Sequence, residues 1–216
     1  MPRPRFDKLE PEKQAAILKV AAEEFAEHGY EAASYNRIIE RSGLSKGAIY
    51  YYFDDKEDLY TTVLRDAMQR LVLDMGNMGH AKDAAAFWTE FEVWYVRSLR
   101  AFQEDPVAIG LARSLVKAMT RGSAGGALAE LRTFARASMD AFIDQGQRLG
   151  AVRSDLPRDL FVSVLMGLEE GIDLWLGERV GGMSEKEIKS SAALLTGIYR
   201  RVAEPPVVTT KTKKKR

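Results

Sequence analysis

The chain has 216 residues, enough to enclose a sizeable hydrophobic core in one large or two small domains. Its hydrophobic fraction of 46% and charged fraction of 29% are those of an ordinary globular protein. Cysteine is absent and only two histidines are present, which excludes disulfides, thiolate zinc sites and cysteine nucleophiles. The net charge is +1, but the last six residues hold five positive charges, so the rest of the chain carries −4. A surface that binds nucleic acid must therefore be a local basic patch.

Several classes of protein are disfavoured by what the sequence lacks. No apolar run is long enough to span a bilayer, and the basic N-terminus has no signal-peptide stretch, so we expect a cytoplasmic protein without membrane contact. The patterns GxSxG and HExxH and the phosphate-binding P-loop do not occur. We therefore expect no enzyme activity, no cofactor and no metal.

The spacing of apolar residues predicts an all-α fold, with helix after helix and no strand. At the N-terminus, a capping box of Asp54 and Glu57 opens the fourth helix. The glycine-containing stretch 76–79 that follows this helix is the best candidate for a domain boundary. The first four predicted helices cover residues 11–29, 35–41, 45–52 and 54–75.

Longer helices are predicted in the second part of the chain. Asp83 and Asp105 can cap two of them, and Ser184 with Glu187 forms a second capping box at the start of the last helix. The final residues, 204–216, contain two prolines, threonines and lysines and are expected to form a disordered basic tail. The predicted helices cover residues 83–103, 105–119, 127–149, 157–176 and 184–202.

The two short helices predicted over residues 35–41 and 45–52 have the pattern of a helix-turn-helix, whose second helix can lie in the major groove of DNA. Ile38 and Ile49 are expected to hold the two helices together, and Gly43 to supply the positive φ of the turn. Ser45 can cap the second helix, whose N-terminus then faces a phosphate, and Lys46 adds a full charge there.

Gly47 lets the backbone come close to DNA, and Tyr50, Tyr51 and Tyr52 offer flat rings and hydroxyl groups. A buried pair of helices is the alternative interpretation of these aromatic residues. Three consecutive tyrosines cannot all point into a core, however, because neighbours on a helix lie about 100° apart. At least one of them must be exposed.

This segment resembles the tetracycline-repressor (TetR-type) family of regulators. The resemblance covers residues 11–64 and rests on Gly29-Tyr30, on Ile38-Ile39 and the run from Arg41 to Phe53, and on Lys56-Glu57-Asp58-Leu59. It implies a three-helix DNA-binding domain over 1–56, joined by the fourth helix to a ligand-binding and dimerisation domain over 57–203. The DNA-binding residues that it implies are Lys46, Gly47, Tyr50, Tyr51, Tyr52 and, as a phosphate contact, Lys56. Ser45 joins these candidates as the cap of the second helix.

Two basic segments outside the helices have an open role. Arg3 and Arg5 could reach a minor groove, as N-terminal arms do, or form a solvated tail. The tail 204–216 could add phosphate attraction or simply be a solvated end.

The last two helices are apolar on more than one side, which indicates that they are buried on two sides. A partner subunit that completes a four-helix bundle would cover the second side, and the resemblance implies the same homodimer. The alternative is a monomer with two central helices. The apolar stripes are formed by Phe161, Val164, Leu165, Leu168, Ile172, Trp175 and Leu176, broadened by Leu160, Val162 and Met166, and by Ile188, Ala192, Leu195 and Tyr199 with Leu194 and Ile198.

Aromatic residues and methionines in the second part are candidates for a small-molecule pocket. The same spacing is also that of plain core. Glu169 and Glu170 could face a cationic or hydroxylated ligand, or be exposed. The candidate ligand-binding residues are Trp88, Phe91, Tyr95, Phe134, Phe142 and Met166.

The sequence thus predicts a ligand-responsive repressor that binds a palindromic operator in double-stranded DNA as a homodimer and is released by an unknown small-molecule effector. The alternative is a transcriptional activator, or a regulator without an effector. A protein-interaction scaffold that has lost DNA binding would require a damaged recognition helix, the second helix of the helix-turn-helix. Residues 45–52 of this chain show no such damage.

Overall fold

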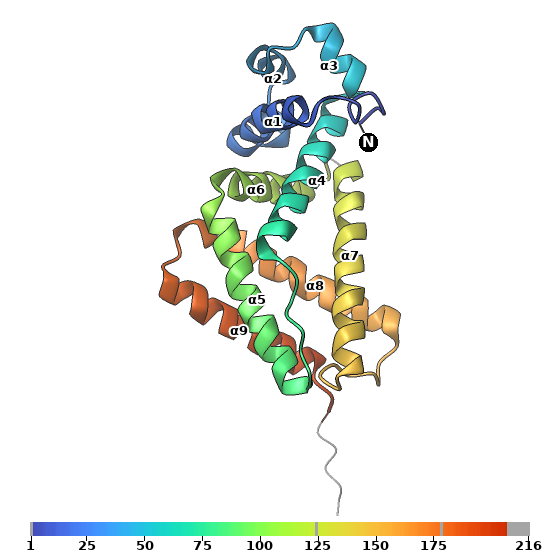
Figure 1. Cartoon of the computed structure of the whole chain (residues 1–216), viewed down its shortest axis with the longest axis vertical. Helices are drawn as coiled ribbons and strands as arrows, with labels where there is room; N and C mark the ends of the chain where they lie inside the picture. Colours follow the sequence, from blue (N-terminus) through green and yellow to red (C-terminus); the bar gives the residue numbers. More distant parts are fainter. Residues whose placement is uncertain (1, 124, 178, 207–216) are drawn as a thin grey trace, which may run out of the picture.

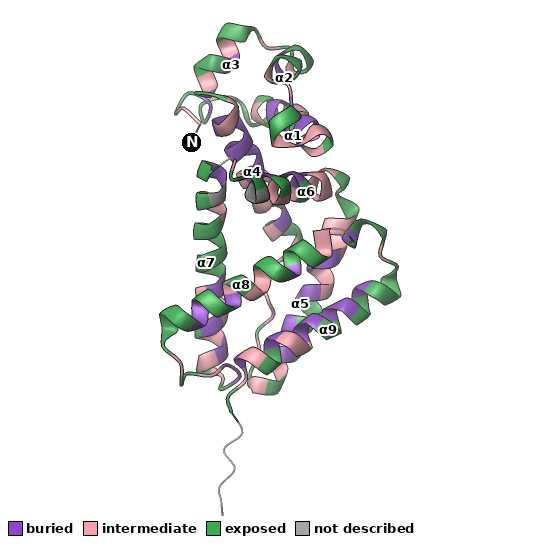
Figure 2. Ribbon diagram, turned by 180° about the vertical axis from the view of Figure 1, so that it is seen from behind, coloured by how far each residue is buried: buried purple, intermediate pink, exposed green. Residues whose placement is uncertain are grey.

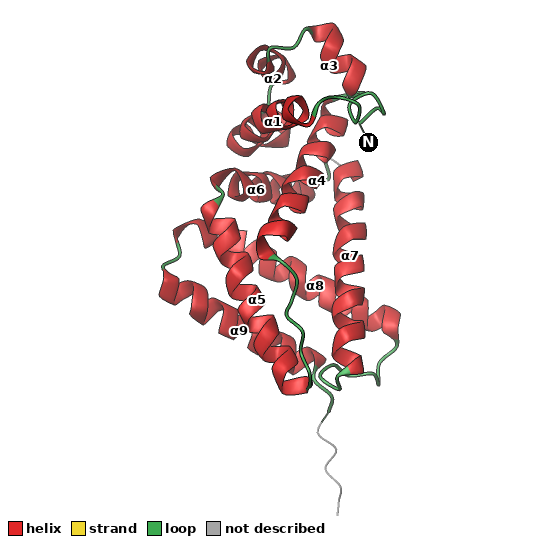
Figure 3. Cartoon of the chain, viewed as in Figure 1, coloured by secondary structure: helices red, strands yellow, loops and turns green. Residues whose placement is uncertain are grey.

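The computed structural model describes residues 2–123, 125–177 and 179–206, and of residues 119, 120 and 128 only the backbone. The described part is entirely helical apart from its loops, as Figure 3 shows, which confirms the all-α prediction. The predicted tail lies outside the described residues from position 207 onward. The helices are α1 (Pro11–Ala32), α2 (Tyr35–Ser42), α3 (Lys46–Tyr52), α4 (Lys56–Met75), α5 (Ala84–Glu104), α6 (Pro106–Arg121), α7 (Gly125–Arg148), α8 (Arg158–Gly177), the short 3-10 helix η1 (Val180–Gly182) and α9 (Glu185–Ala203).

Local signals end and start the helices around the turn as predicted. Gly29 has a φ of 75° and interrupts α1, and Gly43 has a φ of 68° and ends α2. Left-handed backbone of this kind favours glycine, which has no Cβ to clash. The Ser34 hydroxyl accepts a hydrogen bond from the Arg37 N–H, and Ser45 Oγ accepts one from the Ala48 N–H at 3.1 Å. The predicted helix-turn-helix therefore forms from its own caps and turn.

The start of α4 differs from the prediction by one residue. The cap is Asp55, whose carboxylate accepts from the Asp58 N–H at 2.8 Å, and not Asp54. Glu57 does not close a capping box either, because its Oε1 accepts from the Gly126 N–H at 2.8 Å. Neighbouring aspartates are equivalent as caps in the sequence. In the structure Asp54 accepts from the Arg3 guanidinium instead, which leaves Asp55 as the cap.

The predicted caps of the later helices are present. Asp83 accepts from the Ala86 N–H at 2.8 Å, and Asp105 accepts from the Ala108 N–H at 3.0 Å. Ser184 and Glu187 form the predicted capping box at the start of α9. These signals are local, which is why the sequence shows them.

The first of two hydrophobic cores joins the helix-turn-helix to parts of the chain far along the sequence. Helix α6 packs along α1, so closely that a Cβ on Gly110 would lie 2.6 Å from the Ala26 Cβ. Leu111 and Ala118 of α6 and Ala127 of α7 are buried in the same core as the short helices. The boundary after residue 56 stays a prediction, but this core extends across it. Its buried members include Phe6, Ile17, Phe25, Ile38, Ile49, Phe53, Leu59 and Tyr60.

The second core lies at the other end of the molecule, among α5, α7, α8 and α9 (Figure 1). Helices α2 and α3 lie at the far end from it, and α4 runs between the two ends. The ends of α7 contact α4 and α8, whereas its middle, residues 132–138, is exposed on every side. No helix in the described ranges is both long enough and apolar enough to cross a membrane.

The apolar surfaces of α8 and α9 divide differently from the predicted stripes. Leu195 and Tyr199 are buried inside the chain with Phe161 and Leu165, because α9 packs on α5. Figure 2 looks onto α8 and α9 and shows exposed residues along both helices. The stripe with Leu195, one of the two apolar sides predicted for the last helix, is therefore core of the chain itself and not a surface for a second subunit. The large apolar side chains left exposed here are Leu160, Val164, Leu174, Trp175 and Leu194.

Candidate nucleic-acid interface

Helix α3 lies at the end of the molecule farthest from the second core, with one side in the protein and the other side free (Figure 1). Ile49 anchors it and is fully buried together with Ile38 of α2. Ser45, Lys46 and Gly47 form its N-terminal turn and are all exposed. An N-terminal turn with free N–H groups and a lysine is suited to an anion.

The three tyrosines of α3 have different environments. Tyr50 is 43% exposed and Tyr51 is 47% exposed, which agrees with the expectation that not all three are buried. Tyr52 is half-buried, and its ring meets the Phe6 ring edge-on with centroids 6.1 Å apart. Two tyrosines are therefore available to a partner, and the third belongs mainly to the core.

Lys56, the expected phosphate contact, lies at the junction of α1 and α2. Its Nζ donates to the carbonyl oxygens of Glu31 at 3.1 Å and Ala33 at 3.4 Å, and it lies 4.9 Å from the Tyr30 ring centroid. Burial, and then the charges of Glu57 and of two further carboxylates, raise the pKa of the Tyr30 hydroxyl, which stays neutral under the lysine. An ammonium has three N–H donors. These contacts leave one for a phosphate.

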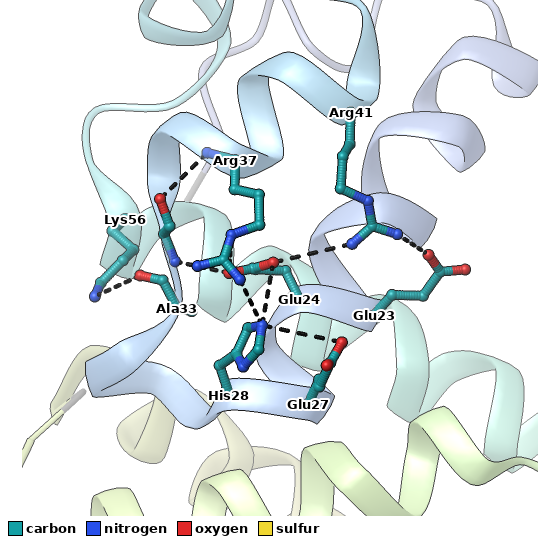
Figure 4. Close-up of polar contacts among 9 residues, drawn as sticks. Glu23, Glu24, Glu27, His28, Ala33, Arg37, Arg41 and Lys56 are labelled. Atoms are coloured by element: carbon teal, nitrogen blue, oxygen red, sulfur yellow. Dashed lines mark hydrogen bonds and ion pairs between the residues drawn. The ribbon is translucent and has the colours of Figure 1, made fainter.

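A buried carboxylate, which the sequence analysis missed, ties α1 to α2 (Figure 4). Glu24 is fully buried, and its Oε1 accepts from the Ser34 N–H at 2.9 Å. Arg37 and Arg41 of α2 approach it at 3.6 and 3.9 Å, and His28 Nε2 lies 3.8 Å from it. A buried charge needs such partners to offset its lost hydration. The signal in the sequence is a glutamate beside Phe25 on the apolar face of α1.

The candidate ligand-binding residues are only partly brought together. Trp88, Phe91, Tyr95 and Phe142 pack ring against ring in the second core, with centroids about 5 to 6 Å apart. Met166 packs against the edge of this core. Phe134 is 40% exposed on the middle of α7 and does not join them. The four rings fill their own space, so a ligand among them requires side chains to move.

An acidic group borders the same rings. The Tyr199 hydroxyl donates to Glu169 Oε2, and Asp173 lies one turn further along α8. Burial, and then the charge of Asp173, raise the pKa of the Glu169 carboxyl to about 8. Glu170, the other glutamate that the sequence singled out, is exposed.

Comparison with known proteins identifies the helix-turn-helix. Residues 17–63 match the model of the bacterial regulatory proteins of the tetR family. The helix-turn-helix of this chain belongs to this family. Its membership confirms the recognition from sequence and confirms a transcriptional regulator, not an enzyme.

Two of the curated relatives of this chain are transcriptional repressors. The chain is 46% identical over 55 residues to the repressor AcnR of Corynebacterium glutamicum, covering 26% of the chain and 29% of AcnR. The chain thus spans less than a third of this relative's length. It is 25% identical over 152 residues to the repressor KstR2 of Rhodococcus jostii, covering 68% of the chain and 72% of KstR2.

A solved structure extends the similarity of fold to almost the whole chain. The fatty acid degradation regulator FadR of Bacillus halodurans superposes with a TM-score of 0.69 at 18% identity, covering 89% of the chain and 97% of FadR. The helices beyond the helix-turn-helix thus share the fold of this structure.

Proposed function

We propose that this protein is a repressor that binds a palindromic operator as a homodimer and is released by a small-molecule effector. The observation that supports it is the side of α3 that faces away from the protein, where a capped N-terminal turn with Lys46 adjoins exposed Tyr50 and Tyr51. The proposed contacts to DNA are Ser45, Lys46, Gly47, Tyr50 and Tyr51, with the edge of Tyr52 and the remaining N–H of Lys56.

The proposed second subunit covers the exposed apolar side chains of α8 and α9. Leu160, Val164 and Leu174 with Trp175 recur at helical spacing on α8, and Gly167 lies between them with open space around its Cα. Five large apolar side chains on two neighbouring helices are unfavourable in water and typical of an interface. A two-fold dimer through this surface would carry two copies of α3, as a palindrome requires.

The proposed effector site is the second core, with Trp88, Phe91, Tyr95, Phe142 and Met166, and with Phe134 as the outlying candidate. Effector binding there would separate the packed rings and shift α5 and α7, whose neighbours α4 and α6 contact α1. Coupling of this kind amounts to a few kcal/mol between two sites.

Selection of bound duplexes from random sequence by the full-length protein tests the proposal. The expected product is a palindrome with half-sites about one DNA turn apart. Tyr51→Ala should lose this selectivity, and Leu73→Ala, on an exposed part of α4, is the matched control. Enrichment of no sequence would contradict the proposal.

The effector and the direction of regulation need separate tests. A compound screen against the bound duplex should yield ligands that release it and that change the fluorescence of Trp88, with Trp88→Phe as the control. A reporter gene behind the selected operator should be repressed. Increased transcription would indicate the activator instead.

A further inference from the structure

The N-terminal segment folds back onto the recognition helix and is not a free arm. Phe6 is 2% exposed, and its ring packs against the Phe53 ring with centroids 4.8 Å apart. The Arg3 backbone N–H donates to the Tyr52 carbonyl at 2.9 Å. The segment Arg3–Phe6 is thus fixed at both ends along the C-terminal end of α3.

Arg3 neutralises the negative end of this helix. Its Nε and Nη2 donate to Asp54 Oδ1 at 2.8 and 2.6 Å, and its Nη1 donates to the Tyr50 carbonyl at 2.9 Å. A helix C-terminus carries a partial negative charge, and Asp54 adds a full one. Without Arg3, both would repel a phosphate that approaches the helix.

Arg5 places a cation beside an exposed tyrosine of α3. Its guanidinium carbon lies 4.2 Å from the centroid of the Tyr51 ring, and Arg5 is itself exposed. No carboxylate in the described ranges pairs with it, and a contact with a ring face leaves N–H donors of a guanidinium free. Lys46 is the only charged residue of α3 and lies at its other end. Arg5 therefore gives the outer side of the helix a second positive charge.

We propose that the docked segment Arg3–Phe6 is one edge of the DNA interface, in which Arg5 contacts a backbone phosphate and Arg3 is a positioning residue. This inference rests on the proposed function. It differs from a minor-groove arm, because the anchors on both sides of Arg5 hold it against Tyr51 and not away from the protein.

Salt titrations of the full-length protein test the role of Arg5. The probes are a duplex selected by the wild-type protein and an unrelated duplex. Arg5→Ala should weaken binding to both on the order of tenfold and reduce the slope of log affinity against log salt by about one, as loss of one phosphate contact does. Arg5→Lys should restore most of the slope. Lys8→Ala removes an exposed cation just beyond the docked segment and should change the slope little.

A second pair of variants tests Arg3. Arg3→Ala should weaken binding to both duplexes because Asp54 then repels phosphate, and Asp54→Asn in the same chain should restore it. Thermal unfolding separates this effect from a loss of folding, since Phe6 still anchors the segment.

The outcomes distinguish the two proposals. Selection of no duplex by the wild type would overturn the proposed function and this inference together. Sequence-specific binding by the wild type together with an unchanged salt slope in Arg5→Ala overturns the inference alone. A loss of affinity in Arg5→Ala that is confined to the selected duplex also overturns it, because that result would indicate a base contact. Equal losses in Arg3→Ala and in the double variant overturn the positioning role of Arg3.

Discussion

Single side chains divide α3 into an outer and an inner side. Tyr51 is exposed beside Arg5, whereas its neighbour Tyr52 packs on Phe6. Replacing each tyrosine with alanine therefore probes different properties of the same helix. The periodicity of the helix predicts this difference in general, but not which tyrosine takes which side.

Tyr51→Ala should leave the free energy of unfolding within about 0.5 kcal/mol of the wild type and weaken operator binding by about 1–3 kcal/mol. Tyr52→Ala should lower the free energy of unfolding by about 1–2 kcal/mol, because the edge contact with Phe6 is lost. Urea denaturation and fluorescence anisotropy on a selected duplex measure the two quantities. A large loss of stability in Tyr51→Ala would place this side chain in the core.

Glu24→Ala should lower the free energy of unfolding by about 2–3 kcal/mol, because the Ser34 N–H loses its acceptor and Arg37 and Arg41 lose a buried counter-charge. Glu24→Gln keeps an acceptor for Ser34 and should fall between this variant and the wild type. The control is Glu23→Ala, which removes a half-exposed ion pair with Arg41 and should cost less than about 1 kcal/mol. Equal losses for Glu23→Ala and Glu24→Ala in urea denaturation would show that burial of Glu24 does not matter.

Among the elements, the helix ends were the most predictable from the sequence. The caps at Ser45, Asp83 and Ser184 and the turn at Gly43 depend on residues within four positions, so the sequence contains the whole signal. The choice of Asp55 over Asp54 depends on tertiary contacts that no local pattern encodes.

Which side chains of each helix are buried was less predictable from the sequence. Leu194 and Leu195 are equally apolar neighbours, and the packing of α9 on α5 alone makes Leu195 core and Leu194 surface. Phe6 stands in a short segment with prolines and arginines, where no periodicity exists to indicate that it is buried. The candidate DNA-binding residues are adjacent in the sequence and lie together. The candidate ligand-binding residues come from three helices, and Phe134 lies apart from the rest.

Gly110→Ala tests the close packing of α6 on α1. The new Cβ would lie 2.6 Å from the Ala26 Cβ and 2.9 Å from the Ala26 carbonyl oxygen, so the two helices must separate. We expect the free energy of unfolding to fall by about 1–3 kcal/mol. Gly125→Ala, at the open start of α7, is the control and should be close to neutral. A fully stable Gly110→Ala protein in thermal unfolding would show that α6 can shift on α1 without cost.

Helix α8 should make stability depend on pH. The pKa of Glu169 is raised by burial to about 8 from an ordinary value of 4.5, so the folded protein binds more protons than the unfolded chain between these values. The free energy of unfolding should therefore fall as the pH rises through this window.

Urea denaturation across this pH range measures the effect. Glu169→Gln should flatten the dependence because the amide does not ionise, and Glu170→Gln, on the exposed side of α8, should change it less. A dependence of the same steepness in Glu169→Gln would assign it to other groups.

At the scale of the whole molecule, the exposed apolar surface of α8 and α9 decides whether one chain or two bind DNA. Val164→Glu and Leu194→Glu place a charge at the centre of the proposed interface, where burial without a partner costs several kcal/mol. Both variants should sediment as folded monomers and lose the palindromic operator while keeping weak binding to any duplex. Leu73→Glu alters an equally apolar side chain on α4, 79% exposed, and should remain dimeric. A wild-type monomer that binds a palindrome tightly would contradict the dimer.

The first hydrophobic core also bears on how this regulator could be re-engineered. A chimera joined at the loop after Met75 would separate the short helices from Leu111, Ala118 and Ala127, and the transplanted unit would expose the apolar surface that these side chains cover. Exchange of residues 35–52 alone replaces α2 and α3 and leaves α1, α4 and α6 as the recipient scaffold, provided that the exchanged segment keeps apolar residues at the buried positions of Ile38 and Ile49. The useful recombination junctions are thus the turns before α2 and after α3. A junction between the two ends of the molecule would divide the first hydrophobic core, because that core contains side chains from both parts of the sequence.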